Sequence, residues 1–289
     1  MCDSDNHQGF IVDTSVTRRS VILTISSVAA VAGLPAEAFA AAKVVETDVM
    51  IKTGDGNADA VLFHPAGKGS WPAVLLWPDI LGLRPVFREM GRRLAAQGYS
   101  VLVPNPFYRS QRAPVVTGSF DFNKPEDRAR LMALRDKLTN ADVDSDAAAY
   151  ITFLDKLKQV NRRKGVGVQG YCFSGPFAFH TAAVRSDRIR AVGSFHGGGL
   201  VTNEPSSPHL LIPKTKAAFL VAIARNDDQK QPEAKDVLKA AFAAAKRPAT
   251  VEVYPADHGW CVAGGQTYNE PAAEKAWAEL LKLYRSQLG

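Results

Sequence analysis

The chain has 289 residues, of which 46% are hydrophobic and 22% charged, and its formal net charge is +6. This composition is typical of a soluble globular protein with room for one large α/β core. Lys and Arg form no dense block, so the modest positive charge predicts a solvated surface and argues against a nucleic-acid partner.

Residues 1–40 differ from the rest of the chain. The pair Arg18-Arg19 precedes a mild apolar run, and an Ala-Phe-Ala site follows at 38–40. A basic region, an apolar stretch and a small-residue site predict a cleavable signal peptide, here of the twin-arginine type. A membrane anchor is disfavoured because a spanning helix needs ~20 apolar residues. We therefore expect export to the periplasm, with residues 41–289 as a single mature domain that is not inserted in the membrane.

Strands and helices alternate along the mature chain. Short apolar runs predict strands, and amphipathic stretches bounded by Pro or Gly predict helices. The expected strands cover 43–53, 57–65, 71–79, 99–106, 164–171, 189–197, 216–224 and 249–255, and the expected helices cover 84–98, 121–138, 139–160, 174–185, 233–246 and 271–288. This alternation predicts one α/β domain with a mostly parallel central sheet and helices on both faces.

The segment GYCFSG, from Gly170 to Gly175, lies between an expected strand and an expected helix. Hydrolases carry a nucleophile elbow of the form Gly-x-Nuc-x-Gly in this context, and its strained turn needs small neighbours. Cys172 has the nucleophile position. Ser174 cannot be the centre of its own elbow, because Cys172 and Pro176 would take the glycine positions. The alternative is that Cys172 is a buried residue at a strand end.

Acidic residues and a histidine follow two later strands. Asp227 and Asp228 come after the first of these strands, and Asp257 and His258 come after the second. The order nucleophile, acid, histidine is that of α/β-hydrolases, and parallel strands bring such residues to one edge of the sheet. His258 would take the thiol proton, and an aspartate would orient its ring. The spacing leaves the choice of aspartate open, and the others would be turn formers.

These motifs resemble those of the dienelactone hydrolase family of α/β-hydrolases. The family motif Gly-Tyr-Cys-x-Gly-Gly reads GYCFSG here, at 170–175. The resemblance implies the α/β-hydrolase fold, a cysteine nucleophile at Cys172 and a catalytic histidine at His258. It selects Asp227 as the acid, because the family acid is the fourth residue of a Gly-x-x-Asp pattern that ARND at 224–227 matches.

The resemblance runs from about residue 45 to the C-terminus and implies further site residues. The backbone N–H groups of Ile80 and Phe173 would hold the oxyanion, since a tetrahedral intermediate develops charge on oxygen. Asp79 replaces a family glutamate that interacts with the resting thiol, and it is a candidate substrate-binding residue. Arg109 matches a family arginine that binds a substrate carboxylate, a task that suits a guanidinium. A surface role for Arg109 is equally open.

The segment after His258 departs from the family. The chain has HGWCVAGG where a second family arginine is expected. Trp260 is therefore a candidate for lining the substrate site, as is His196, although a structural role for His196 is equally open. Cys261 could close a disulfide with Cys172 in an oxidising compartment. The departure predicts the same chemistry on an ester or lactone other than a dienelactone.

We expect an enzyme that cleaves a small-molecule ester or lactone through a thioester intermediate, without a metal or an organic cofactor. Two alternatives stay open at this point. One is a thioesterase or peptide hydrolase with the same three residues. The other is a non-catalytic binding protein that keeps the fold, because a fold does not decide a function.

Overall fold

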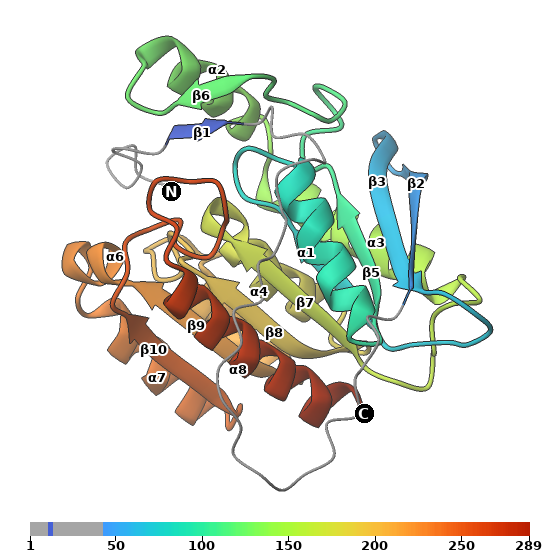
Figure 1. Cartoon of the computed structure of the whole chain (residues 1–289). Coiled ribbons are helices and arrows are strands. Elements are labelled where there is room, and N and C mark those ends of the chain that lie inside the picture. The colour runs from blue at the N-terminus through green and yellow to red at the C-terminus, as the bar shows by residue number, and fades with distance from the viewer. Residues whose placement is uncertain (1–10, 14–42) are drawn as a thin grey trace, which may run out of the picture.

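A central eight-stranded sheet organises the computed structural model, which describes residues 11–13 and 43–289. The strand order is β10-β9-β8-β7-β4-β5-β3-β2 (Figure 1). Strand β3 is antiparallel to both of its neighbours, and all other neighbouring strands are parallel. The strands are β2 (Val44–Thr53), β3 (Gly56–Pro65), β4 (Ala73–Trp77), β5 (Ser100–Pro104), β7 (Val166–Tyr171), β8 (Ile189–Phe195), β9 (Ala218–Ala224) and β10 (Ala249–Tyr254). The mostly parallel sheet expected from the sequence is confirmed.

Helices cover both faces of this sheet (Figure 1). Helices α1 (Pro85–Ala96) and α8 (Glu270–Leu288) bury their apolar residues in one core cluster, with Phe87 and Trp277 among them. Helices α3 (Asn140–Asp155), α4 (Gly175–Val184) and α7 (Ala234–Ala244) pack into a second cluster. Because both faces are covered, every residue of β4 is buried, as is usual for a central parallel strand.

The segment between β5 and α3 packs against the elbow end of the second cluster. It contains β6 (Ser119–Asp121) and α2 (Pro125–Arg135), and β6 pairs antiparallel with the short strand β1 (Ile11–Asp13). Apolar side chains of this segment, such as Phe120, share the core cluster of Phe173. Helix α2 begins later than the expected residue 121 because Pro125 suits a first helical turn.

Each expected strand and helix is present, and the structure adds elements that the sequence did not predict. A short helix, α6 (Arg225–Lys230), replaces the loop expected after β9. Its first turn holds two aspartates, which favour a helix N-terminus electrostatically, but six residues are too few for an apolar period. Two further short helices lie between β8 and β9, namely α5 (Pro208–Leu211) and η3 (Ile212–Lys214).

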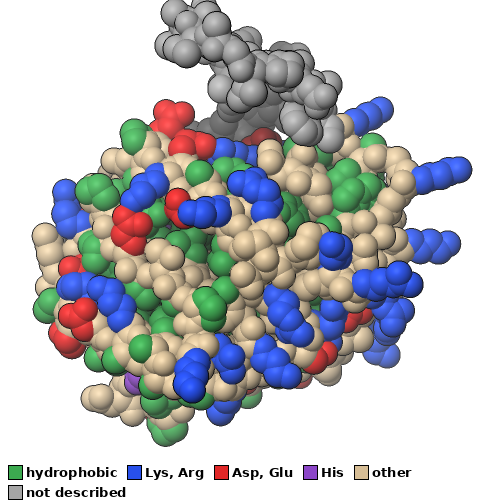
Figure 2. Space-filling view, turned by 90° about the horizontal axis from the view of Figure 1, so that it is seen from below, with side chains coloured by type: hydrophobic (Ala, Val, Ile, Leu, Met, Phe, Trp, Pro, Cys, Tyr) green, Lys and Arg blue, Asp and Glu red, His purple; other side chains and the backbone are tan. Residues whose placement is uncertain are grey.

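The expected signal peptide, including Arg18-Arg19, lies outside the described residues apart from 11–13, so it remains a prediction. Among the helices in the described part of the chain, none combines the length and the hydropathy that crossing a membrane requires. On the face at the bottom of Figure 1, Lys and Arg side chains are scattered among neutral and hydrophobic atoms, with some Asp and Glu between them (Figure 2).

Candidate active site

The elbow places Cys172 in a strained turn between β7 and α4. Its backbone has a φ of 56°, which is rare for a residue with a side chain, and the residue is 4% exposed. The glycines on either side are required by space. A Cβ on Gly170 would lie 2.0 Å from the Ser174 carbonyl oxygen, and one on Gly175 would lie 2.6 Å from the Gly197 Cα. The local sequence therefore folds as a tight elbow with the cysteine at its tip.

Ser174 ties the elbow to the sheet. Its hydroxyl accepts a hydrogen bond from the Tyr171 N–H at 2.9 Å and lies 3.0 Å from the Trp77 carbonyl oxygen on β4. The residue is fully buried. A glycine at this position could not make these contacts. The sequence did not predict this role of Ser174.

His258 is held by two partners that follow β9. Its Nδ1 lies 2.7 Å from Asp227 Oδ2, and its backbone N–H donates to Asn226 Oδ1 at 2.8 Å. The Asp227 side chain is 10% exposed and that of His258 is 2% exposed. Since a carboxylate accepts, this contact orients the ring and keeps the proton on Nδ1. Asn226 is a positioning residue that the sequence did not single out.

The loop after β10 carries His258 across the sheet edge toward the elbow. The His258 ring centroid lies 4.9 Å from that of His196, which directly follows β8. Strand β8 is the immediate neighbour of β7, the strand that ends at the elbow. Neighbouring strands are about 4.8 Å apart, so His258 lies over a strand end next to that of Cys172.

The other aspartates near this edge have different partners. Asp228 pairs with Lys235 at 2.8 Å, and Asp257 pairs with Arg225 at 2.9 Å on the surface. Of these acids, it is Asp227 that contacts the His258 ring.

Asp79 stabilises the turn that contains Ile80. Its carboxylate forms two hydrogen bonds with Arg84, at 2.5 and 2.8 Å, and accepts the Leu81 N–H at 3.0 Å. Both charged side chains are almost completely buried. The Gly82 N–H donates to the Asp79 carbonyl oxygen, and the Ile80 N–H takes no part in these bonds. The contacts of Asp79 are thus those of a structural ion pair, so we do not retain it as a substrate-binding residue.

Arg109 is engaged by carboxylates of the protein itself. Its guanidinium lies 2.6 Å from Asp146 and 2.6 Å from Asp55. Burial lowers the pKa of Arg109, but the hydrogen bonds to Asp146 and Asp55 outweigh burial and raise it above its ordinary value. The expected partner of a substrate carboxylate is therefore already paired, and we do not retain Arg109 in the proposed site.

Trp260 and His196 form the wall behind His258. Trp260 is fully buried and stacks on Tyr254 with ring centroids 4.6 Å apart, and His196 lies edge-on to Trp260 at 6.0 Å. His196 is also fully buried and has a φ of 40°. His196 thus contacts the rings of both His258 and Trp260.

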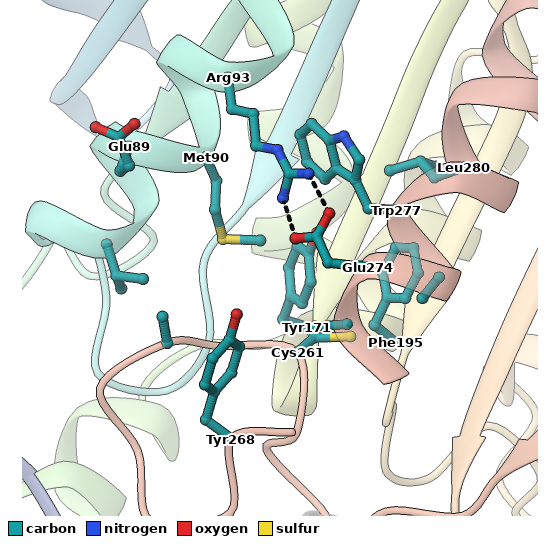
Figure 3. A pocket seen from close by; sticks show the side chains of 14 residues that line it. Glu89, Met90, Arg93, Tyr171, Phe195, Cys261, Tyr268, Glu274, Trp277 and Leu280 are labelled. Atoms are coloured by element: carbon teal, nitrogen blue, oxygen red, sulfur yellow. Dashed lines mark hydrogen bonds and ion pairs between the residues drawn. The ribbon is translucent and has the colours of Figure 1, made fainter. Parts of the chain in front are cut away.

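Cys261 lies on the α1 and α8 side of the sheet, whereas Cys172 belongs to the other core cluster. No disulfide joins the two residues. Cys261 lines a cavity of about 130 Å³, close to Tyr171 and Trp277, and an ion pair between Arg93 and Glu274 lies at its edge (Figure 3). Burial raises the pKa of the Cys261 thiol well above its usual range.

A larger groove, the α4 groove, is lined in part by Phe173, the residue after Cys172. It has a volume of about 460 Å³ and runs between α4, the end of α2 and the loop after β8. Its lining residues are Arg135, Asp136, Leu138, Asn140, Phe173, Pro176, Phe177, His180, Gly198, Gly199, Thr202, Asn203, Glu204, Ser206, Ser207 and Pro208. Among the described residues, no cluster of three or more His, Cys, Asp or Glu side chains is suited to hold a metal ion.

The strand order, the elbow and the histidine after the last strand define the class of protein, an α/β-hydrolase fold. The model of the "Dienelactone hydrolase family" matches residues 58–288. The chain therefore belongs to the dienelactone hydrolase family and is a hydrolase of that kind.

Individual relatives agree with this assignment. The chain is 28% identical over 229 residues to "Carboxymethylenebutenolidase 1" of Cupriavidus pinatubonensis, covering 79% of this chain and 91% of that protein. It is 27% identical over 225 residues to "Carboxymethylenebutenolidase" of Rhodococcus opacus, covering 76% and 83%. A solved structure of a dienelactone hydrolase-like promiscuous phosphotriesterase from metagenomic libraries superimposes with a TM-score of 0.69 at 20% identity, covering 85% of this chain and 99% of that chain. The last likeness shows the fold.

Proposed function

We propose that this protein hydrolyses an ester or lactone by transferring the acyl group to Cys172. The observation that carries the proposal is the Asp227–His258 pair, in which Asp227 belongs to helix α6 after β9 and His258 to the loop after β10, with the His258 ring beside His196 at the end of the strand next to the elbow. A strained cysteine and an oriented imidazole at one sheet edge are the parts that nucleophilic acyl transfer needs.

In the first half of the reaction, His258 Nε2 takes the proton of the Cys172 thiol and Sγ attacks the carbonyl carbon. The N–H groups of Ile80 and Phe173 donate to the oxyanion that forms. When this intermediate collapses, the C–O bond breaks, and His258 returns the proton to the leaving alkoxide. For an ester, the products of this half are an alcohol and a thioester on Cys172; for a lactone, the product is a single thioester that carries the new hydroxyl group.

In the second half, water replaces the alcohol. His258 takes a proton from the water molecule, whose oxygen attacks the thioester carbonyl. The C–S bond breaks, the acid leaves, and the proton returns to the thiolate. Asp227 orients the imidazole and stabilises its protonated form in both halves. No step needs a redox partner or a further co-reactant.

The test is intact-mass analysis of the protein mixed with 4-nitrophenyl acetate, alongside Cys172→Ala. We expect an acyl adduct and nitrophenol release in the wild type and neither in the variant. A matched Cys261→Ala variant should behave as the wild type. If wild type and Cys172→Ala release nitrophenol at the same rate and iodoacetamide spares Cys172 in the native fold, Cys172 is a structural residue and the proposal is wrong. The non-catalytic alternative would then be favoured.

We also propose, from the sequence of residues 1–40, that the protein is exported by a twin-arginine route. Replacing both Arg18 and Arg19 by lysine should retain the protein in the cytoplasm, as fractionation would measure. Unchanged export of that variant would exclude the twin-arginine route.

A further inference from the structure

A second histidine–aspartate pair lies in the α4 groove. His180 Nδ1 on α4 lies 2.9 Å from Asp144 Oδ1 on α3. The His180 residue is 3% exposed and lines the groove, whereas the Asp144 side chain is 43% exposed. The proposed reaction uses neither residue. A nearly buried imidazole that faces a cavity is therefore without a role in the chemistry described above.

The contact with Asp144 determines what His180 offers to the groove. Because a carboxylate accepts, Nδ1 carries a proton and donates it. Within residues 43–289, the hydrogen bond at Nδ1 is the one that this ring makes. In the neutral form of the ring, Nε2 is then the acceptor, and an acceptor suits a hydroxyl group as its partner.

The charges of the groove argue against an anionic occupant. Arg135 pairs with the neighbouring Asp136 at 2.7 Å, and Glu204 adds a second carboxylate to the lining. The lining therefore has no surplus of positive charge. Arg109, the other candidate for an anion, is paired with Asp146 and Asp55.

The neutral side chains of the groove are of two kinds. Phe173, Pro176 and Phe177 form an apolar part next to the elbow in sequence, and Phe173 packs edge-on against Phe177 with ring centroids 4.9 Å apart. Hydroxyl and amide side chains also line the groove: Asn140, Thr202, Asn203, Ser206 and Ser207. A lining that combines apolar and hydrogen-bonding side chains fits a ligand that has both kinds of group.

We infer that the α4 groove binds one side of the substrate, with carbon atoms next to the scissile bond and a neutral hydroxyl group at His180. His180 is four residues, about 6 Å, along α4 from Pro176, so the hydroxyl lies several bonds from the reacting carbonyl. The substrate class is an ester or lactone of a hydroxylated, uncharged molecule. This inference rests on the proposed function and adds the specificity of the same site.

Two esters that differ by one hydroxyl group test it: 4-nitrophenyl hexanoate and 4-nitrophenyl 6-hydroxyhexanoate. One neutral hydrogen bond predicts that the wild type prefers the hydroxylated ester by about 5-fold in kcat/KM. His180→Leu removes the acceptor and should bring this preference close to 1. His180→Gln, which keeps a polar group facing the groove, should restore part of it. His64→Leu, on the distant strand β3, should keep the wild-type preference.

Equal kcat/KM values for the two esters in the wild type, or a preference that persists in a folded His180→Leu, would overturn the inference while hydrolysis itself stands. If neither ester is hydrolysed, the proposed function fails, and a binding experiment then tests the groove site on its own. In that case 1,6-hexanediol is titrated into protein with ¹⁵N-labelled histidine. A saturable shift of the His180 imidazole signals supports the groove site, and no shift overturns it.

Discussion

The two histidine–aspartate pairs have nearly the same local geometry and lie in very different surroundings. Nδ1 is 2.7 Å from the carboxylate in His258–Asp227 and 2.9 Å in His180–Asp144, and both rings are buried. His258 is on a loop at the carboxyl end of the sheet, beside His196, whereas His180 is inside a helix. The pairing orients an imidazole in both places. In the proposed reaction, only the place of the ring relative to Cys172 distinguishes the proposed proton carrier, His258, from the proposed substrate-selecting group, His180.

The largest expected effect distinguishes the two histidine–aspartate pairs by how a substitution in each pair changes activity on the two esters. His258→Gln should lower kcat/KM by about 10²- to 10⁴-fold for the hexanoate and the 6-hydroxyhexanoate alike, because it removes the general base. His180→Leu should instead change the ratio between the two esters. Steady-state kinetics of both variants on both esters would measure kcat/KM and its ratio between the esters. Activity within twofold of wild type in a folded His258→Gln would contradict the assignment.

A smaller effect is expected when the first pair loses its acid. Asp227→Asn keeps the shape of the side chain but removes the charge that stabilises the imidazolium, so we expect kcat to fall, though by less than in His258→Gln. Asp228→Asn is the matched control because its partner is Lys235, and it should stay within about twofold of wild type. An equal loss of activity in Asp227→Asn and Asp228→Asn would contradict the role proposed for Asp227.

The smallest expected effect concerns the two thiols. Burial raises the pKa of Cys261, so at pH 8 a smaller fraction of it is thiolate than in an ordinary cysteine, and its alkylation should speed up only as pH rises further. Cys172, beside the proposed base, should react first with iodoacetamide despite its burial. Peptide mass mapping over time at pH 8 and pH 9.5 measures both rates. Faster labelling of Cys261 at pH 8 would contradict this order.

Local patterns predicted most of the fold and the motif part of the site. Buried parallel strands are continuous apolar runs, so β4 and β7 were recognisable without any partner in view. The elbow needs small residues at set offsets, and GYCFSG has them. By contrast, α6 is too short to show a period, so the residues around Asp227 were expected to form a loop.

Side-chain partners were the part that could not be predicted. Asp79 and Arg109 were expected near the substrate, but Arg84 and Asp146 occupy their charged groups. Ion pairs of this kind depend on which side chains meet across the fold, and Arg109 and Asp146 are 37 positions apart. A local sequence pattern therefore does not predict such an ion pair.

The sequence by itself predicted the mostly parallel sheet, because periodicity and turn chemistry depend on neighbours along the chain, and its resemblance to the family selected Cys172, Asp227 and His258. Only the tertiary structure decided that Asp227 contacts His258, that Arg109 is already paired and that His180 faces a groove beside the elbow. The physical reason is that hydrogen bonds and ion pairs act over a few ångströms, and packing sets which distant residues come that close.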